Sequence, residues 1–181
     1  MKLLIASDIH GDIESTEILI EAYKKHKCDK ILLLGDILYH GPRNNLPGKY
    51  APKEVIELLN SHKDKILSVR GNCDTEVDQM VLAFPILADY ALLELDGLNV
   101  YATHGHNYSE MTPPPLAPGD ILLHGHTHVI RNEKFGNENT YINPGSITLP
   151  KENGPRSYII YENRKFTVYD TIGNVINNII F

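Results

Sequence analysis

Short apolar runs bounded by polar residues and glycines recur along the first third of the chain, as is typical of buried β-strands. They lie at Lys2–Ser7, Ile31–Leu34 and Ile66–Val69. Between them, apolar positions at helical spacing predict helices over Ser15–Lys25 and Pro52–Ser61. Strands that alternate with helices in this way build parallel sheets, because each helix carries the chain back across the sheet.

Strands dominate the second half of the chain. Tyr90–Leu95 and Leu98–Thr103, separated by Asp96-Gly97, predict a hairpin with a two-residue turn. Further strands are predicted at Ile121–His124, Tyr141–Asn143, Ser157–Tyr161 and Lys165–Tyr169. Two packed sheets flanked by helices would bury this many short strands. We expect one α/β domain over residues 1–181, since a single core accommodates up to roughly 250 residues.

Charge and composition remove several classes of protein. The chain has 17 Lys and Arg against 23 Asp and Glu, a formal charge of −6, so no basic patch for nucleic acid is evident. The apolar run that follows Lys2 meets Asp8 too soon for a secretory leader or a membrane span. We therefore expect a cytoplasmic protein. Cys28 and Cys73 are too few for a disulfide framework.

Residues that can bind metals or catalyse reactions follow the predicted strands, where ligand crevices form in α/β sheets. The pairs Asp8/His10 and His126/His128 are spaced i, i+2, which places both side chains on one side of an extended segment. Glycines beside them permit close approach of the backbone. The set expected to converge is Asp8, His10, Asp36, Asn72, His104, His126 and His128.

This set indicates a centre of two metal ions. Seven ligands exceed what one tetrahedral zinc uses, but they suit two first-row metals at roughly 3.5–4 Å, which can polarise a phosphoryl group for in-line attack. Asp36 is the candidate for the carboxylate that both ions share. Mixed nitrogen and oxygen ligands favour Mn, Fe, Co, Ni or Zn over Ca or Mg.

Five sequence blocks in order resemble the signature of the calcineurin-like metallophosphoesterases. The blocks are Asp8-x-His10, Gly35-Asp36-x4-Gly41, Gly71-Asn72-Cys73-Asp74, His104-Gly105-His106 and Gly125-His126-Thr127-His128. The segments His40-Gly41-Pro42-Arg43-Asn44 and Asn143-Pro144-Gly145-Ser146 further resemble the small bacterial YfcE-type phosphodiesterases. The resemblance extends from Asp8 to at least Ser146, which is most of the chain.

The resemblance implies a four-layer α/β/β/α sandwich of two mixed sheets flanked by helices. It implies phosphodiester hydrolysis by a metal-bound hydroxide at two divalent ions, with Mn²⁺ the first choice. It places one ion on Asp8, His10 and His128, the other on Asn72, His104 and His126, and Asp36 between them. In the YfcE-type subgroup the cysteine at the position of Cys73 is assigned as the active-site residue. Proton donor, nucleophile and substrate contact stay open as its role.

The sequence also supports further candidate residues and alternative functions. His40 and Arg43 are candidate substrate contacts because their loop follows Asp36, although loop residues of these types are usually solvated. The same metal set would serve a phosphomonoesterase or a nucleotide pyrophosphatase. A non-catalytic interaction scaffold is the alternative from another class, since a retromer subunit uses this fold in that way. The expected partner is a small phosphodiester substrate, and self-association is possible.

Overall fold

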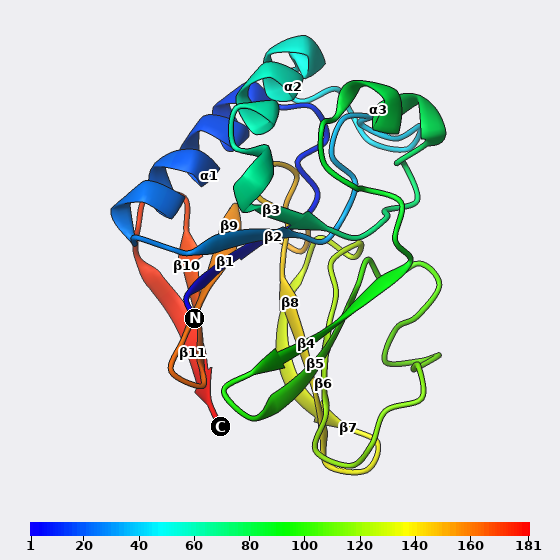
Figure 1. Ribbon diagram of the computed structural model, residues 1–181, viewed down its shortest axis with the longest axis vertical. Coiled ribbons are helices and arrows are strands. Elements are labelled where there is room, and N and C mark those ends of the chain that lie inside the picture. Colours follow the sequence, from blue (N-terminus) through cyan, green and yellow to red (C-terminus); the bar gives the residue numbers. More distant parts are fainter.

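Two mixed β-sheets pack face to face in the computed structural model, which describes residues 1–181 (Figure 1). The first contains β1 (Leu3–Ala6), β2 (Lys30–Leu33), β3 (Ile66–Ser68), β9 (Ser157–Glu162), β10 (Lys165–Asp170) and β11 (Val175–Ile180). The second contains β4 (Tyr90–Leu95), β5 (Leu98–Thr103), β6 (Ile121–Leu123), β7 (Ile130–Phe135) and β8 (Asn139–Pro144). The strand orders are β11-β10-β9-β1-β2-β3 and β4-β5-β6-β8-β7.

Each sheet has parallel strands next to antiparallel ones. In the first sheet β1, β2 and β3 are parallel, and in the second β5, β6 and β8 are parallel. The predicted hairpin forms β4 and β5, with Leu95 opposite Leu98. Asp96 and Gly97 between them both have positive φ angles, 54° and 80°, as a type I′ turn requires. The mixed sheets and the α/β class are therefore confirmed.

Helices α1 (Ile13–Lys25) and α2 (Pro52–Asn60) pack on the side of the first sheet that faces away from the second (Figure 1). A third, short helix is α3 (Glu76–Val81). Asp12 fixes the start of α1, because its carboxylate accepts hydrogen bonds from the Ser15 N–H and hydroxyl at 2.8 Å. Leu19 and Ile20 are on the buried face of this helix. None of the helices has the length and apolar character needed to span a membrane.

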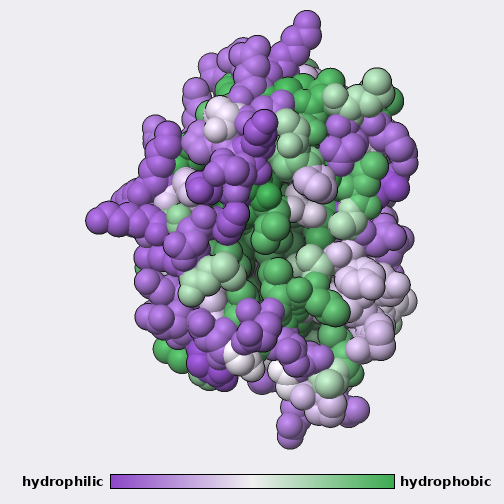
Figure 2. All heavy atoms as spheres, in the orientation of Figure 1, coloured by the Kyte–Doolittle hydropathy of each residue, from purple (hydrophilic) through white to green (hydrophobic).

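β1 belongs to two hydrophobic cores because it is buried on both faces. Its Leu4 packs in the cluster beneath the helices, whereas Leu3 and Ile5 pack in the cluster between the sheets. Figure 2 shows a hydrophobic band down the middle of the molecule in the same orientation as Figure 1. The alternation of side chains along one short strand thus joins the layers.

The fourth layer of the sandwich is not helical. No helix follows Val81, and the loop at residues 104–120 covers part of the outer face of the second sheet instead. There Tyr108 packs edge-on against Tyr90 and Tyr101, which stack with ring centroids 4.8 Å apart. Pro113-Pro114-Pro115 lie in this loop, which agrees with the exclusion of proline from helix interiors.

Apart from the single 3-10 turn at Lys63–Lys65, three elements have no counterpart among the predicted ones: α3, β7 and β11. α3 has only six residues, too few for a helical period to stand out, and none of them is buried. β7 and β11 are edge strands. Their sequences, IRNEKF and VINNII, contain polar pairs where a central strand would be apolar. The hydrophobic pattern therefore misses short or edge elements, because their residues are not buried in a core.

We propose that the two sheets unfold as one domain, because they share the cluster that contains Ile159 of β9. Ile159 is 0% exposed, so Ile159→Ala is expected to lower the free energy of unfolding by about 3 kcal/mol. Urea unfolding followed by far-UV circular dichroism and by tyrosine fluorescence should show one shared midpoint that moves in the variant. Two separate transitions would contradict this organisation.

Candidate metal centre

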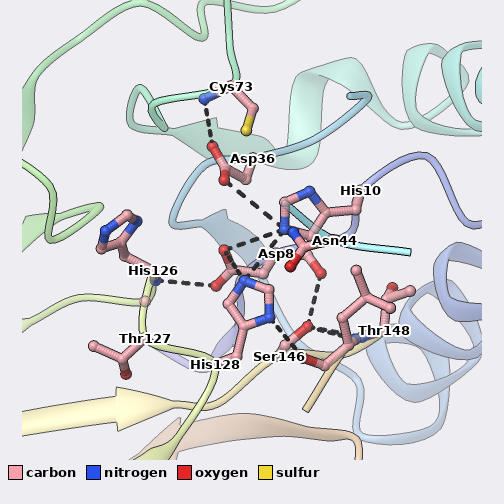
Figure 3. A network of polar contacts seen from close by, with 12 residues as sticks. Asp8, His10, Asp36, Asn44, Cys73, His126, Thr127, His128, Ser146 and Thr148 are labelled. Atoms are coloured by element: carbon pink, nitrogen blue, oxygen red, sulfur yellow. Dashed lines mark hydrogen bonds and ion pairs between the residues drawn. The ribbon is translucent and has the colours of Figure 1, made fainter. Parts of the chain in front are cut away.

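Loops at the carboxyl ends of the parallel strands hold the candidate ligands, and hydrogen bonds fasten these loops together. The Asp8 N–H donates to the Gly35 carbonyl at 3.1 Å, and the His10 N–H donates to the Asp36 carbonyl at 2.9 Å. From the second sheet, the His126 N–H donates to the Asp8 carboxylate at 3.1 Å. The ends of β1, β2 and β6 therefore meet at one place (Figure 3).

The candidate ligands reach this place through left-handed backbone and not through extended segments. The φ angles of Asp8, His10, His126 and His128 are 60°, 52°, 66° and 61°. The prediction that each i, i+2 pair lies on an extended segment is therefore wrong, although the side chains of each pair still converge. Asp36 has a φ angle of 56° as well. Such conformations cost roughly 1–3 kcal/mol each and gather at functional sites, where the surrounding structure enforces them.

The first group of atoms consists of hydrogen-bond acceptors that face one another. His10 donates its Nδ1–H to the Tyr39 carbonyl at 2.7 Å, and His128 donates its Nδ1–H to the Leu149 carbonyl at 2.6 Å. In neutral rings this leaves a lone pair on each Nε2, and these two atoms are 3.3 Å apart. The Asp8 Oδ1 atom is 3.3 Å from the His128 Nε2 and has no hydrogen-bond donor.

The second group repeats this arrangement. His104 donates its Nδ1–H to the Leu34 carbonyl at 2.6 Å, so its Nε2 carries the lone pair of a neutral ring. This Nε2 is 3.1 Å from the Asn72 Oδ1 atom and 3.1 Å from the His126 Nδ1 atom. The Asp36 Oδ2 atom lies between the two groups, 3.8 Å from the His10 Nε2 and 3.5 Å from the His104 Nε2.

The chemistry of these donors fits divalent cations. A buried polar atom without a partner costs about 1–3 kcal/mol, and lone pairs that face one another repel. A cation in each group would satisfy every one of these atoms, and imidazole nitrogen with carboxylate oxygen suits first-row divalent metals. Asp8 with His10 and His128, and Asp8 with Asp36 and His104, also have ligand atoms close enough to bind one ion.

The pKa values of the group show that a positive charge is favoured at His104 and disfavoured at His126. Burial alone would lower the pKa of His104, but the carboxylates of Asp36 and Asp8 outweigh it and raise this pKa to about 9. Burial and the charge of His104 lower the pKa of His126 to about 4. Burial would raise the pKa of Asp8, yet the neighbouring histidines, His128 first, bring it below its usual range. A positive charge is thus favoured among these carboxylates.

Asp74 holds the loops after β2 and β3 against each other. Its buried carboxylate accepts the N–H groups of Asp36 and Gly71 at 2.8 Å each and that of Ile37 at 2.9 Å. Burial raises the pKa of Asp74 to about 6. Gly71 must be glycine, because a Cβ there would overlap the Asp36 carboxylate. Asp74 belongs to the Gly-Asn-Cys-Asp block, but the sequence alone gave it no role.

Cys73 lies beside Asp36 at the edge of the first group (Figure 3). Its N–H donates to the Asp36 Oδ1 atom at 2.8 Å, and its Sγ accepts from the Asn72 amide at 3.3 Å. The Sγ atom lies within 4.8 Å of ligand atoms of His10 and Asp36. Burial, and then the charge of Asp36, raises the pKa of the thiol above its ordinary value. This environment keeps the thiol protonated.

A pocket of about 400 Å³ opens over these residues. Its wall includes Arg43, as predicted for a substrate contact, whereas His40 is not part of it. The His40 ring instead lies edge-on between Tyr39 and Tyr50, with centroid distances of 4.8 and 5.4 Å. Three further polar residues line the pocket without a role predicted from the sequence: Asn44 and Thr127, which belong to the quoted motif blocks, and Lys151, which belongs to none.

The fold and these motifs define a family. Residues 1–165 match the model of the calcineurin-like phosphoesterase superfamily domain. The chain belongs to this superfamily, which confirms the resemblance seen in its sequence.

Among known proteins, phosphodiesterase YfcE of Escherichia coli strain K12 is 44% identical over 168 residues, 93% of this chain and 91% of that protein. A solved structure of YfcE, a phosphoesterase from E. coli, has a TM-score of 0.95 at 41% identity, and the match covers 99% of this chain and 98% of that one. The probable metallophosphoesterase YsnB of Bacillus subtilis strain 168 is 27% identical, covering 99% of this chain and 96% of YsnB. Vacuolar Protein Sorting 29 from Cryptosporidium parvum shares the fold, with a TM-score of 0.64 at 20% identity over 99% of this chain and 98% of that one.

Removal of the Asp74 carboxylate tests its role in holding the two loops together. Asp74→Ala leaves three buried N–H groups without an acceptor, so the free energy of unfolding should fall by about 3 kcal/mol in urea titrations. Asp64→Ala is the matched control, because that carboxylate is exposed, and it should leave the urea midpoint unchanged. Equal behaviour of the two variants would rule out the proposed role of Asp74.

Proposed function

We propose that this chain is a phosphodiesterase that hydrolyses its substrate at a centre of two divalent cations. The observation that carries the proposal is the pair of acceptor groups that share the Asp36 Oδ2 atom at the floor of a polar pocket. The similarity to phosphodiesterase YfcE over 93% of the chain supports the choice of a diester over a monoester or a pyrophosphate.

Seven side chains would hold the two ions. Asp8, His10 and His128 would bind one, and Asn72, His104 and His126 the other. Asp36 would contact both. Two such ions, when bound, activate water and neutralise charge on a phosphoryl group. Mn²⁺ is our first choice, with Fe, Co, Ni and Zn as alternatives that the same donor set accepts.

The protein's own groups orient the ligands and complete the pocket. The carbonyls of Leu34, Tyr39 and Leu149 each accept an Nδ1–H, which fixes the rings of His104, His10 and His128 so that Nε2 faces inward. Arg43 and Lys151 supply positive charge at the pocket wall, where phosphate oxygens or an anionic ester arm would lie.

Cys73 is our candidate for the group that assists the departing alkoxide. Water activated at such a centre serves as the nucleophile, so a thiolate is not needed in that role. The Cys73 thiol at the pocket wall can instead donate its proton to the leaving oxygen, or contact it. Cytoplasmic location and self-association stay predictions from the sequence.

Metal content tests the centre directly. Purified protein supplied with Mn²⁺ should bind two ions per chain by mass spectrometry, and His126→Ala or His128→Ala should each leave about one ion, with hydrolysis of bis(p-nitrophenyl) phosphate reduced on the order of 100-fold. His62→Ala is the control, because His62 is hydrogen-bonded at the end of α2, and it should change neither value. Protein that binds no metal and hydrolyses nothing would favour the non-catalytic scaffold.

A Cys73 variant tests the role of this residue separately from metal binding. Cys73→Ala should lower kcat on the order of 100-fold, as expected for the loss of a general acid, while metal content stays at that of the wild type. Cys28→Ala is the matched control, since this second cysteine packs in the core beneath the helices. Undiminished turnover in Cys73→Ala would remove this residue from the mechanism.

A further inference from the structure

An apolar groove of about 430 Å³ lies between α2 and α3. Its lining includes Tyr39, Tyr50, Ile56, Val77 and Val81. Three of these side chains remain open to solvent, with exposures of 70% for Val77, 45% for Val81 and 42% for Tyr39. Figure 2 shows hydrophobic atoms at the surface in the region of α3. Exposed apolar side chains that gather around a hollow are typical of a binding groove.

The groove adjoins the metal pocket. Cys73 lines both hollows, so their walls share this side chain. Tyr39 provides a second connection, because its carbonyl accepts the Nδ1–H of His10 while its side chain lines the groove. Thr75 also lines the groove and directly follows Asp74, the carboxylate that holds the loops around Asp36. A molecule bound at the metal centre could therefore extend into this groove.

The two hollows differ in chemistry. The metal pocket is lined almost wholly by polar side chains, with Pro42 as its apolar member, and it includes Arg43 and Lys151. The groove is mostly apolar, with two aromatic rings and several aliphatic side chains, and its polar members are Lys53, Thr75 and Asp78. A diester has two arms, and an apolar arm would have no apolar wall to contact unless it entered the groove.

We propose that the groove binds a flat, apolar ester arm of the substrate, so that the preferred substrates are phosphodiesters with one aromatic or similarly apolar arm. This inference rests on the proposed function, because the phosphate of such a substrate occupies the metal pocket. The groove sets the preference among diesters through contact with the arm, and it takes no part in the chemical step.

The test compares two diesters that share a glycerol arm, phenyl glyceryl phosphate and diglyceryl phosphate. Val77→Asp places a charge in the groove at a side chain that is 70% exposed, so the fold tolerates it. Met80→Asp is the matched control, because it adds the same charge to the same helix at a residue that is 84% exposed and outside the groove. For each substrate the measured quantity is kcat/KM of the variant relative to the wild type, by phosphorus NMR, so intrinsic differences between leaving groups cancel.

Val77→Asp should lower kcat/KM for phenyl glyceryl phosphate about tenfold, mainly through KM, because an apolar ring then meets a charge. The value for diglyceryl phosphate should change less than about twofold, and Met80→Asp should affect neither substrate. Equal effects of Val77→Asp on both diesters, or no effect, would overturn the inference. So would a change in oligomeric state on size-exclusion chromatography, which would assign the groove to contact between copies. Wild-type protein that hydrolyses neither diester with Mn²⁺ would instead refute the proposed function, and the groove inference with it.

Discussion

Mutual repulsion among inward-facing lone pairs is the constraint on which the rest of this structure depends. The Nε2 atoms of His10 and His128 are 3.3 Å apart, and the Asp8 Oδ1 atom beside them has no donor. The His104 Nε2 faces the Asn72 oxygen, and the carboxylates of Asp36 and Asp8 favour a positive charge on this ring. Without a positive charge among them, these groups are unfavourably placed. The arrangement becomes favourable with cations in place, and then a strained, buried and acidic site can persist.

The scaffold enforces this geometry from behind the ligands. Three histidines donate their Nδ1–H groups to backbone carbonyls, and these hydrogen bonds prevent the rings from turning Nε2 away from the centre. Asp74 joins the loops that carry Asp36 and Gly71. Left-handed backbone at five of the seven candidate ligands points their side chains inward. β1 and β2, which end here, are almost wholly buried on both faces, so the strain is held at the core of the fold.

The sequence predicts the central strands, two of the helices and the convergence of all seven candidate ligands, because buried strands and residues such as Asp8 and His126 leave clear local patterns. It does not predict α3, β7 or β11, because α3 is too short to show a helical period and the two edge strands are rich in polar residues. Nor does it predict the role of Asp74 or the presence of Lys151 at the pocket, since both depend on contacts between distant loops. The local sequence pattern identifies the candidate ligands, whereas the groups that orient them are determined by tertiary packing.

We propose that the two acceptor groups bind two cations that share Asp36. Anomalous diffraction from crystals soaked in Mn²⁺ tests this proposal most directly. We expect two anomalous peaks, one next to Asp8, His10 and His128 and one next to Asn72, His104 and His126, with Asp36 contacting both. A single peak, peaks elsewhere on the molecule, or no peak in crystals soaked at saturating Mn²⁺ would contradict a centre of two cations.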